Sequence, residues 1–167
     1  MKNNFTKKDI KNSVEYQWRK NSFCWLLGIW AFIAVAMLFV ILIIGFDDIK
    51  SGMGLQVWLI VMSIYSVIYL PFVAYYGYKM FYILKHYAEF NSYEAMLDNV
   101  STSQMYRGAV YYTVTINDEG VTRQVDTNAY FSSSMFAKFT LEDYNNKKVI
   151  GLYDSRMDKF YVIKKIG

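Results

Sequence analysis

The sequence predicts an α+β membrane protein, in which a two-helix transmembrane hairpin is followed by a helical stalk and a small antiparallel β-barrel or curled sheet. Two long stretches, 21–46 and 51–78, contain no charged residue. Charged residues make up 19% of the 167 residues, fewer than the quarter that is usual in soluble domains. After residue 100, β-branched and aromatic residues alternate with polar ones, which is the pattern of β-strands.

Both uncharged stretches are long enough to cross a bilayer as helices. A helix rises about 1.5 Å per residue, so roughly 20 residues span the hydrocarbon layer. We place transmembrane helices at about 22–46 and 55–80, within a membrane region of 21–85 and joined by a polar loop. A cleaved signal peptide is disfavoured, because the first apolar stretch is too long and ends without a small-residue cleavage site.

The distribution of charge predicts the orientation. Basic residues gather in 1–20 and again at Lys79 and Lys85, whereas the loop between the two helices holds only Lys50. The positive-inside rule therefore predicts a multi-pass protein of the cell membrane with both termini in the cytoplasm. Aromatic side chains are expected at the membrane interface, and the candidates are Trp18, Trp25, Tyr75, Tyr76, Tyr78 and Tyr82.

Residues 1–20 have the pattern of a basic amphipathic segment. Thr6 followed by Asp9 is typical of a capped helix start, and Ile10, Val14 and Trp18 then recur every four residues among lysines. We expect this segment to lie along the inner leaflet with membrane lipids as its partner. Nucleic acid is disfavoured as a partner, because 80–167 carries ten basic and ten acidic residues and is neutral.

Small residues at Gly28, Ala31 and Ala34 are spaced to permit close approach of the second helix, with Ser63 and Ser66 facing them. Neither predicted span contains a charged residue at mid-membrane depth. Ion pathways and proton relays depend on such residues, so a pump or transporter that works alone is disfavoured.

The second half of the chain predicts a stalk and a β-domain. Residues 86–100 are expected to form the stalk, with a break near 91–92 and a second short helix left open. Residues 101–167 are expected to form a small cytosolic β-domain. Its strands are predicted at 109–116, 121–127, 147–153 and 159–165, with a shorter one near 135–140. Turn residues separate these strands, and a barrel or curled sheet would leave few exposed edges.

Four features of the β-domain recur in a known family: Gly108-x-Val110, a tyrosine-rich strand, an acidic-glycine turn, and Val149-x-x-x-Tyr153-Asp154 before a closing apolar strand. Residues 100–167 thereby resemble the domain-of-unknown-function 3592 family of bacterial membrane-anchored proteins. Ser155 stands where that family commonly has a proline. The resemblance implies an architecture, a membrane anchor with a small β-domain, and no chemistry.

No catalytic, cofactor-binding or metal-binding residues are predicted. One His (His86) and one Cys (Cys24) cannot form the usual zinc clusters. Cys24 fits a small core residue, with lipidation as the alternative. The acidic pairs at 118–119 and 142–143, and the pair Asp154 and Asp158, fall in predicted turns, where acidic residues serve the backbone.

These observations favour a non-enzymatic bacterial inner-membrane protein that presents a cytosolic β-domain for protein–protein interaction, as an accessory or assembly subunit of a membrane complex. The partner is an unidentified protein or another copy of the chain. Two alternatives stay open: an immunity-type protein that protects against a membrane-active toxin, and a transport component that functions only as an oligomer. Tyrosines supply contact area at low entropic cost, and the candidate partner surface comprises Tyr111, Tyr112, Tyr130 and Tyr153.

Overall fold

The computed structural model describes residues 4–44, 53–102, 109–118, 120–131 and 144–166. The chain forms two compact units. The helical unit comprises Ser22–Tyr78, and the β unit combines Met1–Asn21 with Lys79–Gly167. The beginning of the first long helix and the end of the second therefore belong to the β unit.

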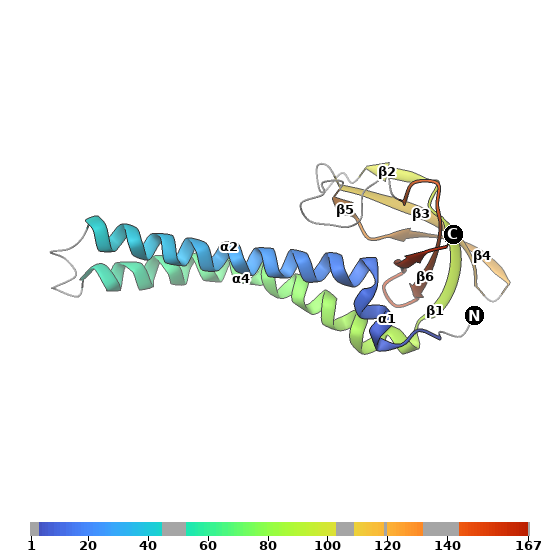
Figure 1. The fold of residues 1–167 in the computed structure, drawn as a ribbon, viewed down its shortest axis with the longest axis horizontal. Coiled ribbons are helices and arrows are strands. Elements are labelled where there is room, and N and C mark those ends of the chain that lie inside the picture. The colour runs from blue at the N-terminus through green and yellow to red at the C-terminus, as the bar shows by residue number, and fades with distance from the viewer. Residues whose placement is uncertain (1–3, 45–52, 103–108, 119, 132–143, 167) are drawn as a thin grey trace. The chain divides into compact units, whose positions relative to one another are not determined.

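Two long apolar helices run antiparallel and side by side in the helical unit (Figure 1). They are α2 (Val14–Ile44) and α4 (Met53–His86), and Pro71 lies within α4. Their 31 and 34 residues correspond to about 46 and 51 Å of helix. Both are long and apolar enough to cross a membrane, as the sequence predicts.

Aromatic side chains hold these two helices together by hydrogen bonds. The three bonds run from Trp30 Nε1 to Ser66 Oγ at 3.1 Å, from Trp58 Nε1 to the Ala34 carbonyl at 3.2 Å, and from Tyr69 OH to the Leu26 carbonyl at 3.2 Å. A Cβ built on Gly28 would meet nothing within 4 Å. The predicted close approach at Gly28 is therefore wrong, because long indole and phenol side chains bridge the helices instead.

The N-terminal segment forms α1 (Lys7–Asn12), and its predicted start is confirmed. The backbone N–H of Thr6 donates to the Asp9 carboxylate at 2.8 Å, and the Asp9 N–H donates to Thr6 Oγ1 at 3.3 Å. Ser13 adopts an extended conformation that separates α1 from α2. Ile10, on the apolar side of α1, is fully buried within the β unit, so this side of the helix packs against protein.

The predicted helical stalk over 86–100 is also wrong. Helix α4 ends at His86, a short 3₁₀ helix η1 follows (Tyr87–Glu89), and the chain then enters strand β1 (Asn91–Met96). Strand β1 pairs antiparallel with the distant strand β6, so long-range pairing overrides the helix-like spacing of these residues. The predicted break near residue 91 is where the helical backbone ends.

The remaining strands are β2 (Val100–Thr102), β3 (Ala109–Asp118), β4 (Val121–Thr127), β5 (Tyr130–Phe131), β6 (Lys148–Asp154) and β7 (Lys159–Lys165). The four strands predicted at 109–116, 121–127, 147–153 and 159–165 are thereby confirmed as β3, β4, β6 and β7. The shorter strand expected near 135–140 lies outside the described residues. Gly120 has φ of +85°, which suits glycine in the tight turn between β3 and β4.

The sheet is mixed and open. Of the two predicted forms, a barrel or a curled sheet, the barrel is wrong, and the expectation that every strand pair is antiparallel is wrong as well. Six strands follow the order β1-β6-β7-β4-β3-β2, and β5 pairs separately with β3. Strands β4 and β7 are parallel, over Asp126↔Lys159 and Thr127↔Phe160. The sheet curls until β1 lies beside β3. Tyr93 OH donates to the Asp118 carboxylate across this gap, and no ladder closes it in the described strands.

Strands β6 and β7 carry buried residues on both faces. Leu152, Tyr161 and Ile163 of the sheet pack in a buried cluster with residues from other elements. These are Ile10 of α1, Tyr82 and Ile83 of α4, and Phe90, which directly precedes β1. The ring of Phe160, from the neighbouring strand β7, lies directly over Gly151 of β6. A Cβ added at Gly151 would lie 2.3 Å from this ring. The end of α4 is thus part of the β unit's own core.

Candidate functional site

Polar side chains buried at the helix ends form the first candidate site. Asp154, at the end of β6, is fully buried and its carboxylate accepts three hydrogen bonds. Tyr82 OH donates to Oδ2 at 3.0 Å, Tyr161 OH donates to Oδ2 at 3.2 Å, and the Arg156 N–H donates to Oδ1 at 3.0 Å. Burial raises the pKa of Tyr161, and the neighbouring Asp154 carboxylate raises it further. This group fastens α4 to the sheet.

A second buried group fastens the start of α2. Glu15 is fully buried and pairs with Arg19, whose Nη2 lies 2.6 Å from Glu15 Oε1. The side-chain amide of Asn128, just after β4, donates to the same Glu15 oxygen at 3.0 Å. The four-residue spacing of Glu15 and Arg19 is a recognisable helical ion-pair signal, but only the fold shows that the pair is buried. We call the Asp154 and Glu15 groups together the junction cluster.

A third polar group lies where β1, the β3–β4 turn and the β6–β7 turn meet. Tyr93 bonds to Asp118, while Tyr153 OH donates to Asp158 Oδ1 at 3.0 Å. Arg123 Nε lies 4.0 Å from Asp118 Oδ2. Burial raises the pKa of Tyr153, the bond to Asp158 adds to this, and Arg123 opposes it. Two of the acidic turn residues thus orient tyrosines from neighbouring strands.

No group of three or more His, Cys, Asp or Glu residues in the part of the chain that the structure describes is placed to hold a metal ion. His86 Nδ1 lies 3.0 Å from Glu89 Oε1, and Arg156 Nη2 donates to the other oxygen of Glu89 at 2.5 Å. Residues 119, 132–134 and 142–143 lie outside the described residues.

The predicted interface aromatics separate into two groups. Trp25, Tyr75 and Tyr78 are about half exposed on the helical unit, and Tyr76 is partly buried beside Tyr75. Trp18 and Tyr82 are instead buried within the β unit. Tyr82 packs in the cluster around Ile10 and its hydroxyl donates to Asp154, neither of which the sequence alone reveals.

The predicted tyrosine surface is largely buried. Tyr112 is fully buried and Tyr153 is 3% exposed, so neither offers contact area to a partner. Tyr111 is half-buried, as expected from its pointing to the face opposite Tyr112. The side chain of Tyr130 lies outside the described part of the structure. Cys24 is exposed rather than in a core, beside a shallow apolar groove lined by Trp25, Gly28, Ile29 and Phe32.

The free edge of β4 was not anticipated as a site. Over 121–125 no described strand pairs with its outer side, because β7 meets β4 only at Asp126 and Thr127. The register with β3 directs the N–H groups of Thr122 and Gln124 to this outer side. Val121, Thr122, Arg123 and Gln124 are all exposed. The far end of the β3–β4 hairpin projects from the sheet (Figure 1).

A search with protein-family models finds no match to the chain, and comparisons with curated proteins and with solved structures find none either. The resemblance to the domain-of-unknown-function 3592 family therefore stays an expectation.

Proposed function

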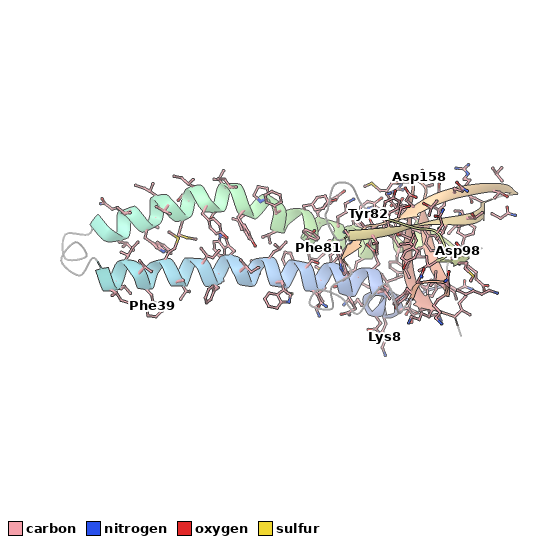
Figure 2. The ribbon with its side chains drawn as sticks, turned by 90° about the horizontal axis from the view of Figure 1, so that it is seen from above. Lys8, Phe39, Phe81, Tyr82, Asp98 and Asp158 are labelled. Atoms are coloured by element: carbon pink, nitrogen blue, oxygen red, sulfur yellow. The ribbon has the colours of Figure 1, made fainter. Side chains whose placement is uncertain are left out.

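We propose that this chain is a bacterial membrane-anchored binding protein: α2 and α4 span the cell membrane, both termini lie in the cytoplasm, and the β unit binds another protein. The observation that carries the anchor is the exposed apolar surface of both helices. Phe32, Ile43 and Val67 are each more than 70% exposed. Phe39 points away from α4 in Figure 2 and is 59% exposed. In water such a surface would be strongly unfavourable, whereas lipid covers it.

The orientation is supported by charge outside the apolar part. Lys20, Lys79 and Lys85 flank it on the side of the β unit. The positive-inside rule then assigns the β unit to the cytoplasm. The hydrogen bonds made by Trp30, Trp58 and Tyr69 fit this environment, because polar groups in hydrocarbon need partners within the protein.

The binding role is supported by the free edge of β4. An exposed strand edge presents unpaired backbone groups, and an extended peptide can add to it as a further strand. Val121 is 56% exposed at the far end of this edge, where it offers an apolar contact beside the backbone. We therefore propose that the partner contributes an extended segment that pairs with β4.

Two experiments test this function. First, the full-length protein in isolated membranes should resist extraction by alkaline carbonate, and a reporter active only outside the cytoplasm should stay silent when fused after Gly167. Release of the protein by carbonate would refute the anchor, and an active reporter would refute the orientation.

Second, affinity purification in mild detergent should recover a partner whose binding depends on the β4 edge. Gln124→Pro removes an outward N–H without removing a ladder bond to β3, whereas Gln124→Ala keeps the N–H and serves as the matched control. We expect loss of the partner with Gln124→Pro alone. Equal binding by both variants, or recovery of the wild-type protein as a lone monomer, would refute the proposed edge contact.

A further inference from the structure

Helix α1 presents a face of lysines that the fold leaves available. Lys7, Lys8 and Lys11 are exposed, and no ion pair joins them to a carboxylate among the described residues. The one acidic residue of the helix, Asp9, is held by Thr6 in the cap. The Lys8 side chain projects away from the rest of the β unit in Figure 2. The result is a fixed cluster of positive charge.

The opposite side of α1 holds the helix in place. Ile10 is fully buried in the cluster that contains Tyr82 and Ile83. A disordered segment would lose conformational entropy when its lysines bind, whereas lysines on a packed helix already have an ordered backbone. The buried Ile10 also prevents α1 from inserting an apolar side into lipid without leaving the core.

Helix α1 packs against the part of α4 that directly follows its apolar stretch. Tyr82 and Ile83 follow Tyr78, the last residue of the helical unit, by about one helical turn, or roughly 6 Å. Ile10 packs in the same cluster as these two residues, so α1 is held on the segment of α4 that continues from the proposed membrane span.

We infer that α1 binds the anionic headgroups of phospholipids through Lys7, Lys8 and Lys11, at the membrane surface and without inserting. The inference rests on the proposed membrane anchor. Lys–phosphate attraction acts over the thickness of a headgroup layer, since the Debye length is about 8 Å at physiological salt. Such binding holds α1 against the membrane surface.

The test uses the full-length protein in vesicles of phosphatidylcholine with a minor fraction of phosphatidylglycerol. Spin-labelled lipids report the binding constant for phosphatidylglycerol relative to phosphatidylcholine. Lys8→Gln/Lys11→Gln should lower this selectivity, by up to about fivefold per lysine at low salt, and high salt should remove most of the wild-type preference. Both replacements keep good helix formers at exposed sites, so the fold is retained.

Lys147→Gln/Lys148→Gln is the matched control, because it removes the same charge at exposed positions. These lysines lie at the start of β6, about 20 Å along the strand from Asp154, which is bonded to Tyr82. We expect wild-type selectivity from this control. Unchanged selectivity in the α1 variant, or an equal loss in the control, overturns the inference while leaving the anchor intact. Extraction of the wild-type protein by carbonate refutes the anchor itself.

Discussion

Replacing Gly151 by alanine tests how tightly the β unit is packed. A Cβ at this position would lie 2.3 Å from Cε1 and Cζ of Phe160 and 2.7 Å from the carbonyl oxygen of Tyr161. The carbonyl belongs to the neighbouring strand, so it cannot move without disturbing the β6–β7 ladder. The Phe160 ring is fully buried and has no solvent-exposed position to adopt.

The overlap with the ring is about 1 Å relative to an ordinary carbon–carbon contact, and overpacking of a rigid core costs about 1–3 kcal/mol. We expect Gly151→Ala to reduce the free energy of unfolding by about 3 kcal/mol, near the upper end of this range. The added Cβ cannot move away from the Phe160 ring, because the Tyr161 carbonyl oxygen lies on its other side. For a unit of roughly a hundred residues this loss of stability corresponds to a decrease in Tm of about 10–20 °C.

Thermal unfolding of the detergent-solubilised chain, followed by the near-ultraviolet circular dichroism of its tyrosines, measures the effect. Gly28→Ala is the matched control, since a Cβ there meets nothing within 4 Å, and we expect its Tm to equal that of the wild type. The double variant Gly151→Ala/Phe160→Leu should lose less stability than the two single variants together. A Gly151→Ala protein within about 0.5 kcal/mol of wild type, or strict additivity in the double variant, would refute the packing argument.

Three further predictions address polar groups. Asp154→Ala should destabilise the β unit by about 2–5 kcal/mol in urea unfolding, because it leaves the buried hydroxyls of Tyr82 and Tyr161 without their acceptor. Asp154→Asn should lose clearly less stability, since its amide oxygen can still accept. The pKa of Tyr161 is raised in the folded state, so its contribution to stability is complete below about pH 10 and is lost as the pH rises further. Tyr161→Phe should therefore reduce the loss of stability at alkaline pH by up to about 1.4 kcal/mol per pH unit. Trp30→Phe, which removes the bond to Ser66, should lower resistance to unfolding in sodium dodecyl sulfate by about 0.6–1.7 kcal/mol, with no change in the Tm of the β unit.

The parts of the fold that were predictable are those whose signal is local. The strands at 109–116 and 121–127 combine alternation with a glycine turn, and they pair as an antiparallel hairpin. The two long helices follow from uninterrupted apolar composition, and the α1 cap from the spacing of Thr6 and Asp9. Each of these signals lies within one continuous stretch of fewer than thirty residues.

The missed features depend on residues that are distant in the sequence. Strand β1 is Asn-Ser-Tyr-Glu-Ala-Met, which has weak β-propensity, and it becomes a strand by pairing with β6 more than fifty residues later. The parallel contact of β4 with β7 likewise has no local signature. Asp154 lies in a stretch with strong turn chemistry, and only the packing of α4 against the sheet shows that it binds Tyr82.

The burial of the junction cluster and of Ile10 has a consequence for dissecting the protein. A chain that begins at Tyr87 contains every strand, but it lacks Ile10, Tyr82 and Ile83. Each of these buried side chains contributes about 1.5–3 kcal/mol, so their combined loss approaches the 5–15 kcal/mol that stabilises a typical domain. We therefore expect the 87–167 fragment to lack a cooperative unfolding transition.

The matched test joins residues 4–21 to residues 79–167 through a flexible glycine–serine linker in place of the helical unit. This chain restores the cluster around Ile10 and the pairing of Glu15 with Arg19 and Asn128. It should be soluble and unfold in one transition, because the exposed apolar helices are absent while the core is complete. Equal stability of the linked chain and the 87–167 fragment would show that the helix ends do not stabilise the β unit and are not parts of its core.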